Sequence, residues 1–191
     1  MKVLRNFSPM GLATLAAGLV AVLFLVIVVA DSDEDEGSSA LDNGLGKHIN
    51  WHRLDDGLAA AKEQAKPLML IIHKSWCGAC KSLKPKFSES QKISKLSKKF
   101  IMVNTMDDDE PPMDIYKPDG GYVPRILFFD PEGELYKDVV NEEGNPEYMY
   151  YYYDELSIVG SMEKVVDLIA ASSENLLNSD DTDRKPDKSE L

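Results

Sequence analysis

The sequence predicts an α/β domain in which helices flank a central mixed β-sheet. Segments with apolar residues at helical spacing alternate with short, continuous apolar runs, and this alternation is typical of strands that are buried on both faces. A turn signal and a further apolar helix follow the last run. The chain has 191 residues, and the roughly 150 that follow its N-terminal segment are enough for one domain with a real core.

The first half of the predicted domain contains a helix, a strand and a second helix. Residues 54–66 have apolar side chains at helical spacing, and Pro67 ends this helix. Residues 67–72 form a continuous apolar run, which favours a strand covered on both faces. Apolar positions in residues 83–98 predict the next helix, with a kink at Pro85.

The second half contains the remaining strands and a final helix. The apolar runs 100–103 and 123–129 predict two strands, and the turn signal at residues 130–133 leads into a further strand at 134–140. Apolar residues at helical spacing over 158–169 predict a long amphipathic helix. Helices on both faces of such a sheet complete the α/β architecture.

Charge and cysteine content exclude several classes of function. The net charge is −12 and the pI is near 4.7, which argues against binding to nucleic acid, because phosphate contacts require Lys and Arg. Proteins are therefore the expected partners. Two cysteines cannot form a disulfide framework or a four-cysteine zinc site. We expect no metal, since the only histidines available to complete a mixed site are His48, His52 and His73.

Cys77 and Cys80 are three residues apart where a predicted strand meets a helix. Side chains at this spacing on a first helical turn are close enough to form a disulfide. The helix N-terminus favours the thiolate of Cys77, and Lys74 and Lys81 add positive charge nearby. A structural disulfide closing so small a loop would stabilise the fold little. We therefore predict a redox pair in which Cys77 attacks and Cys80 resolves the mixed disulfide.

Residues 1–30 are expected to direct the chain into the secretory pathway. Lys2 and Arg5 precede an uncharged stretch over residues 11–30 that ends in a small residue, as in a signal peptide. The stretch is also long enough for an uncleaved signal-anchor, the only case in which we expect a membrane partner. Residues 31–46 are predicted to be an acidic linker before the domain at 47–177.

Residues 178–191 are predicted to be a disordered tail that ends in a retrieval signal. The last four residues differ from Lys-Asp-Glu-Leu only at the second position. Together with the N-terminal segment, they predict residence in the lumen of the endoplasmic reticulum and binding to the retrieval receptor. The signal consists of Lys188, Ser189, Glu190 and Leu191.

Two motifs resemble the thioredoxin family. One is the run Trp-Cys-Gly-Ala-Cys at residues 76–80 after an apolar strand, and the other is Val123-Pro124 at the start of a later strand. Their flanking residues are similar to the small single-domain proteins of the endoplasmic reticulum related to the anterior gradient proteins. The resemblance covers roughly residues 50–170 and implies a thioredoxin-like fold.

The resemblance also implies an activity, which is thiol-disulfide exchange with secretory client proteins. In that family the matching proline is cis and lies beside the two sulfurs, and an extended client pairs with the backbone before it. The family also suggests glutathione-linked reduction of protein disulfides, with glutathione as a co-substrate and no bound cofactor. The client-binding positions that the resemblance implies are Trp76, Gly78, Ala79, Val123 and Pro124.

A tyrosine-rich segment and the absence of a buried acid leave a second function open. Ile71 occupies the position where thioredoxins carry a buried acid that shuttles the proton of the second thiol, so resolution by Cys80 is expected to be slow. Ala79 stands where the isomerases have a histidine, which predicts a less oxidising pair. The tyrosine-rich segment 148–153 is either a binding surface or a strand-like segment packed on the body. The alternative function is therefore a chaperone or escort that binds clients, with redox activity secondary.

Overall fold

The computed structural model describes residues 41–182, and the side chains of residues 41–172. Within this range no helix is long and apolar enough to cross a membrane. The predicted signal segment 1–30 and the retrieval signal 188–191 lie outside the described residues.

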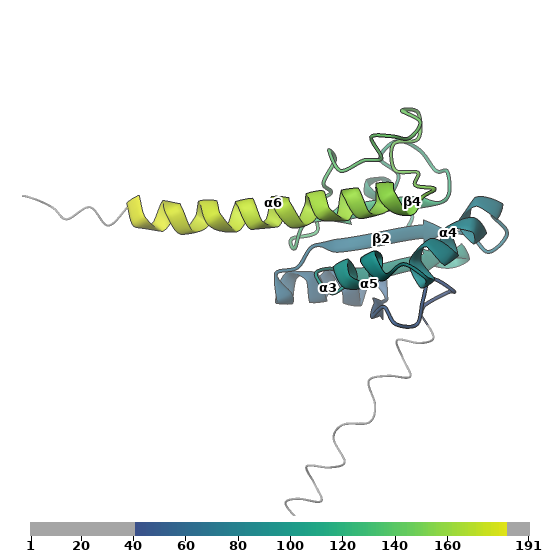
Figure 1. Cartoon of the computed structure of the whole chain (residues 1–191), viewed down its shortest axis with the longest axis horizontal. Helices are drawn as coiled ribbons and strands as arrows, with labels where there is room; N and C mark the ends of the chain where they lie inside the picture. Colours follow the sequence, from purple (N-terminus) through teal and green to yellow (C-terminus); the bar gives the residue numbers. More distant parts are fainter. Residues whose placement is uncertain (1–40, 183–191) are drawn as a thin grey trace, which may run out of the picture. The chain divides into compact units, whose positions relative to one another are not determined.

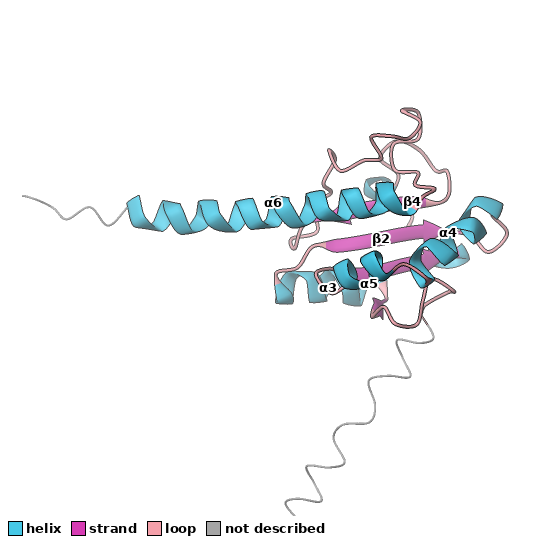
Figure 2. Ribbon diagram, in the orientation of Figure 1, coloured by secondary structure: helices cyan, strands magenta, loops and turns pink. Residues whose placement is uncertain are grey.

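Four strands form a mixed sheet in the order β1-β3-β2-β4 (Figure 2). β1 and β2 pair parallel with β3, whereas β4 runs antiparallel to β2. All six residues of β2 are buried, because this strand has a neighbour on each side and helices over both faces. This explains why its sequence is a continuous apolar run. The strands are β1 (Trp51–His52), β2 (Leu68–His73), β3 (Ile101–Met106) and β4 (Arg125–Phe129).

Helices cover the two faces of the sheet unequally. Side chains of alternate β2 residues point to opposite faces, so Met69 and Ile71 join the core beneath α4, α5 and α6, whereas Leu70 and Ile72 pack with α3. In Figure 1, α3 is fainter than α5 because it lies behind the sheet. The helices are α3 (Leu54–Gln64), α4 (Gly78–Ser88), α5 (Gln91–Ser97) and α6 (Glu155–Thr182), with two 3₁₀ turns at η1 (Asp107–Asp109) and η2 (Asp114–Tyr116).

The single helix predicted over residues 83–98 is two helices, α4 and α5. Pro85 lies inside α4, and the break falls after it, at Ser90. The Ser90 hydroxyl accepts a hydrogen bond from the Ile93 backbone N–H at 3.1 Å and donates one to Glu155 at 2.6 Å. A capped N-terminus therefore starts a new helix at this point and ties it to α6.

The prediction of a strand over residues 134–140 was wrong. Only one isolated bridge remains, between Leu135 and Phe129. The chain then turns, since the Val139 N–H bonds to the Tyr136 carbonyl at 3.1 Å. The turn ends the pairing, so β4 is left as the edge of the four-stranded sheet.

The predicted domain limits also differ from the structure. Residues 41–46 were assigned to the linker, but Leu45 is only 1% exposed and packs in the core. Asn43 also donates a hydrogen bond to Asn104 of β3 at 2.7 Å. At the other end, α6 continues to Thr182, past the start of the tail predicted at residue 178. The packed core therefore begins before residue 47, and helix α6 ends after residue 177.

Candidate active site

Strand register brings the two predicted motifs to the same end of the sheet. Ile72, near the end of β2, pairs with Arg125 at the start of the antiparallel β4. The cysteine loop that follows β2 therefore lies beside Pro124, which immediately precedes β4. The Val123–Pro124 peptide bond is cis, as the family resemblance implied.

Cys77 is the N-cap residue of α4. Its backbone is extended, and its Sγ accepts a hydrogen bond from the Cys80 backbone N–H at 3.1 Å. In this way the sulfur takes the place of the Ser or Asp oxygen that usually satisfies a free N–H at a helix start. The Cys77 sulfur therefore lies at the helix N-terminus and accepts a backbone N–H there.

The Cys77 sulfur also faces the backbone just before Pro124. Its Sγ lies 3.7 Å from the backbone oxygen of Val123, in the geometry of a hydrogen bond from the thiol. Both cysteines are free thiols in this structure. The two sulfurs and the backbone at Val123 are thus contiguous.

The resolving position is more enclosed than the attacking one. Cys77 is 7% exposed and Cys80 only 1%. Burial, followed by its hydrogen bonding with Cys77, raises the pKa of Cys80 to about 12. Ile71, at the position of the family's buried acid, is fully buried in the core. Cys80 must therefore lose its proton to water or to another group before it can attack.

The five predicted client-binding residues differ in their exposure. The Trp76 side chain is 73% exposed directly before Cys77. Gly78 is exposed with open space at its Cβ position, and Ala79 is half-buried. Val123 is half-buried and Pro124 is buried. The cysteine loop is therefore open to solvent at Trp76 and Gly78.

An ion-pair cluster that the sequence analysis missed links the two halves of the site. Glu110 accepts from Lys74 Nζ at 2.7 Å and from Arg125 NH2 at 2.5 Å. Lys74 belongs to the cysteine loop, and Arg125 follows Pro124. The positive charge of Lys74, which we expected to act on the cysteines, is therefore directed to Glu110. A charged residue inside the apolar run 123–129 was the available signal, because a buried Arg needs a partner.

Arg125 also shapes the loop that leads to Pro124. Its side chain is completely buried. It donates hydrogen bonds to two backbone carbonyl oxygens, that of Tyr116 at 3.1 Å and that of Tyr122. Burial alone would raise the pKa of Glu110, but the hydrogen bonds and charges of Lys74 and Arg125 outweigh it and hold that pKa below its ordinary value. The carboxylate thus stays ionised and can hold both cations.

The histidines do not form a metal centre with their neighbours. His73 is buried at the end of β2, where its Nε2 lies 3.2 Å from Asn104 Oδ1, and burial lowers its pKa. His52 lies in β1, and no helix places it beside His48. Within the part of the chain that the structure describes, no three His, Cys, Asp or Glu side chains are grouped to hold a metal ion.

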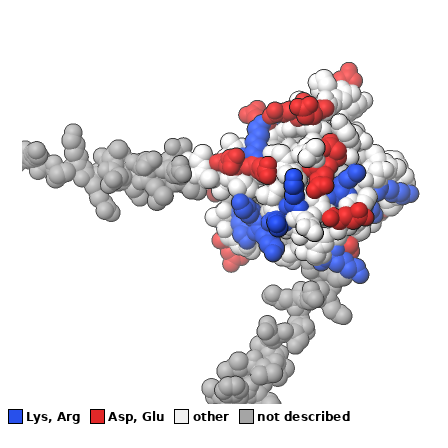
Figure 3. Space-filling view, in the orientation of Figure 1, with Lys and Arg blue, Asp and Glu red and all other residues white. Residues whose placement is uncertain are grey.

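On the face drawn in Figure 3, basic and acidic side chains are interspersed.

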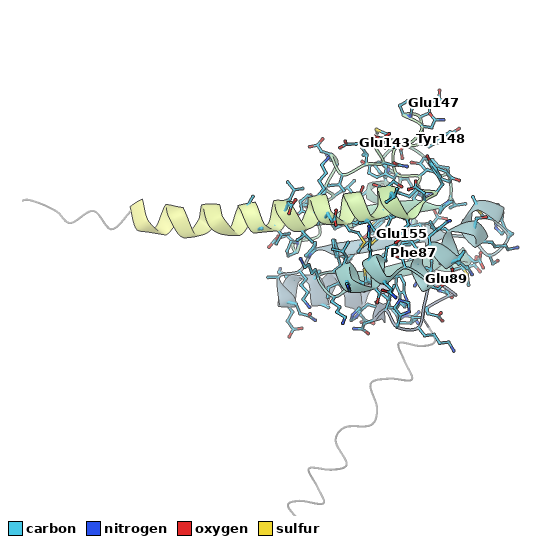
Figure 4. The ribbon with its side chains drawn as sticks, in the orientation of Figure 1. Phe87, Glu89, Glu143, Glu147, Tyr148 and Glu155 are labelled. Carbon is cyan, nitrogen blue, oxygen red and sulfur yellow. The ribbon has the colours of Figure 1, made fainter. Side chains whose placement is uncertain are left out.

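The tyrosine-rich segment combines the two interpretations that the sequence left open. Tyr150 and Tyr152 are 2% and 1% exposed and pack in the core, although no strand forms over residues 148–153. Tyr148 and Tyr153 are 45% and 55% exposed. Figure 4 shows Tyr148 on the loop side of the sheet, close to Glu147. The segment is therefore anchored by two rings and presents others to solvent.

Fold and site together define a thioredoxin-like protein with a Cys-x-x-Cys pair opposite a cis-proline. A family model described as thioredoxin-like matches residues 50–131. The chain is 33% identical to anterior gradient protein 3 of Mus musculus over 162 residues, covering 81% of this chain and 97% of that protein. It is 37% identical to anterior gradient protein 1 of Xenopus tropicalis over 135 residues, covering 68% and 69%. The chain belongs to the anterior gradient family of thioredoxin-like proteins.

Proposed function

We propose that this protein is a thiol-disulfide oxidoreductase that acts on secretory client proteins in the endoplasmic reticulum. The observation that carries the proposal is the position of the Cys77 sulfur. It accepts the Cys80 N–H at 3.1 Å and lies 3.7 Å from the Val123 oxygen. The nucleophile thus accepts a backbone N–H at the start of a helix and lies beside a backbone edge that an extended client can follow.

In the reductive direction, the Cys77 thiolate attacks one sulfur of a client disulfide. The client S–S bond breaks, a Cys77–client disulfide forms, and the released client thiolate takes a proton. Cys80 then loses its proton and attacks the Cys77 sulfur. The second client thiolate leaves, so the client has gained two electrons and the protein holds a Cys77–Cys80 disulfide. Oxidation of a reduced client is the same sequence in reverse.

Glutathione is the proposed co-substrate that returns the pair to the dithiol form. Two glutathione molecules would supply the two electrons and leave as glutathione disulfide. The direction of net transfer follows from the reduction potential of the pair relative to the compartment. Equilibration of the purified protein in glutathione redox buffers measures that potential directly.

Trapping of the mixed disulfide tests the proposed activity. In the Cys80→Ser protein the resolving thiol is missing, so Cys77 should accumulate in disulfides with secretory proteins on non-reducing gels. The Cys77→Ser protein should form none. Absence of trapped complexes with the Cys80→Ser protein would contradict the proposal.

The proposed location rests on the two ends of the sequence. Residues 1–30 have the features of a signal segment, and residues 188–191 are close to a retrieval signal. Deletion of the last four residues should move the full-length protein from the cell to the medium. Unchanged retention would show that these residues are not the signal.

A second candidate function is client binding without exchange, as a chaperone or escort. The exposed aromatic side chains of Trp76, Tyr148 and Tyr153 favour it, as does the apolar Ile71 in place of a proton-accepting acid. A protein with both cysteines changed to Ser separates the two functions. It should still recover clients if binding is primary, and it should lose them if the mixed disulfide is what holds them.

A further inference from the structure

A small aromatic pocket lies directly beside the docking edge. It has a volume of about 240 Å³ and is lined by Tyr122, Val123, Tyr148 and Tyr151. Val123 contributes a wall of the pocket while its backbone oxygen lies 3.7 Å from the Cys77 sulfur. The pocket and the reactive sulfur are therefore separated by a single residue of the chain.

Hydrogen bonds fix one wall of this pocket. The Tyr122 hydroxyl donates to Asp119, with distances of 2.7 and 2.8 Å to the two carboxylate oxygens, and accepts from the Tyr150 N–H at 3.0 Å. The same carboxylate accepts from the Met149 N–H at 2.7 Å. Asp119 thus ties the loop before Pro124 to the tyrosine-rich segment. A pocket held in this way needs little reorganisation to accept a ligand.

The rings are arranged to receive another ring. Tyr122 and Tyr148 meet edge to face, with centroids 4.9 Å apart and planes at 77°. Aromatic rings favour this tilted arrangement, and a third ring can join it. Tyr148 is 45% exposed, so part of its surface is free for such a contact.

The size and chemistry of the pocket indicate what it binds. Sites that enclose a whole small molecule usually have about 300–1,000 Å³, so 240 Å³ suits one large side chain. None of the four lining residues carries a charge. Glutathione, with its charged ends, would gain little from such walls. An aromatic side chain would bury its ring there against three tyrosines.

We propose that this pocket is a specificity subsite for an aromatic side chain of the client, next to the client cysteine that Cys77 attacks. The inference rests on the proposed exchange activity and adds a sequence preference to it. In an extended peptide, side chains two residues apart lie on the same face and about 6.6–6.8 Å apart. A client that follows Val123 with its cysteine at Cys77 thus brings a neighbouring side chain to Tyr148.

The test uses short peptides whose single cysteine is joined to 2-nitro-5-thiobenzoate through a disulfide. Attack by Cys77 on the peptide sulfur releases the coloured thiolate, so absorbance reports the rate. One peptide carries Phe two residues before the cysteine, another carries Phe two residues after it, and a third carries Ala at both positions. The reduced protein reacts stoichiometrically, and we expect its second-order rate constant with one of the two Phe peptides to exceed that with the Ala peptide by about tenfold.

Three variants assign the effect to the pocket. Tyr148→Ala should remove the preference for Phe, whereas Tyr148→Phe, which keeps the ring, should retain it. Leu156→Ala is the matched control, because Leu156 is an exposed apolar residue that does not line the pocket. It should leave the preference unchanged. Circular dichroism confirms that each variant is folded.

The results separate loss of the exchange activity from loss of the aromatic subsite. If 5,5′-dithiobis(2-nitrobenzoate) and all peptides fail to react with the reduced protein, the exchange activity itself is refuted. If the peptides react but Phe gives no advantage in either position, only the aromatic subsite is refuted. An undiminished advantage in Tyr148→Ala would also overturn the assignment to this pocket.

Discussion

The Glu110 cluster should stabilise the domain and couple the two loops of the site. Glu110 holds Lys74 of the cysteine loop at 2.7 Å and Arg125, the first residue of β4 after Pro124, at 2.5 Å. Glu110→Gln keeps the shape of the side chain but removes its charge, which leaves the buried Arg125 guanidinium without a counter-ion. Removing one partner of a fully buried pair costs about 3–5 kcal/mol.

The expected cost in this protein is below that range, because the pair is not fully buried and Arg125 keeps other partners. Glu110 is 17% exposed, and Arg125 keeps its bonds to two backbone oxygens. We expect the free energy of unfolding to fall by about 2–3 kcal/mol. For a domain of this size the melting midpoint should then drop by about 5–10 °C. Urea and thermal unfolding followed by circular dichroism measure both quantities.

Glu142→Gln is the control for the Glu110 variant. Glu142 is 69% exposed and pairs with Lys164 at 2.7 Å, and surface pairs of this kind contribute little to stability. Its loss should leave the melting midpoint unchanged. An equally small effect of Glu110→Gln would refute the structural role of the cluster.

The lowered pKa of Glu110 makes its contribution to the free energy of unfolding depend on pH in a defined direction. Burial works against ionisation, but the hydrogen bonds from Lys74 and Arg125 hold this pKa below 4.5, its usual value. The stabilisation is therefore fully present above the unfolded pKa and is lost as the pH falls through the folded one. The difference in stability between wild type and Glu110→Gln should narrow on acidification below about pH 4.5.

Three further predictions follow from the site and its supports. Ser90→Ala removes the cap on the Ile93 N–H and should cost about 1 kcal/mol in urea unfolding; no change would show that the cap is dispensable. Trp76→Ala should alter stability by less than about 0.5 kcal/mol yet slow exchange with peptide disulfides, and an unchanged rate would remove Trp76 from the docking surface. Because burial raises the pKa of Cys80, resolution of a Cys77–peptide disulfide should accelerate about tenfold per pH unit from about pH 7 to pH 9, and a flat profile would contradict proton loss as the limiting event.

The parts of the fold that could be predicted are those in which local sequence and burial agree. β2 was predicted because a strand covered on both faces needs apolar side chains throughout. The break between α4 and α5 was missed, although Ser is a common N-cap residue and its bond with the Ile93 N–H is local; only the bond from Ser90 to Glu155 depends on the fold. Residues 134–140 have a strand-like sequence, but a turn after Tyr136 ends the pairing.

In the site, too, the residues in local motifs could be predicted, whereas those that act through distant contacts could not. Cys77, Cys80 and Pro124 belong to short motifs, so spacing and resemblance were enough to propose them. Glu110 and Asp119 act through contacts with residues far along the chain, such as Arg125 and Met149, and no local pattern identifies such pairs. For Arg125 a signal did exist, since a charge inside a buried strand requires a partner.

Alkylation of the reduced protein distinguishes the two cysteines without any client. Cys77 is the more exposed sulfur and accepts the Cys80 N–H, whereas burial raises the pKa of Cys80 to about 12. Iodoacetamide near neutral pH, followed by peptide mass spectrometry, should therefore label Cys77 first and leave Cys80 unmodified until the protein is unfolded. Labelling of Cys80 at the same rate as Cys77, or before it, would contradict the roles of attacking and resolving thiol assigned to this pair.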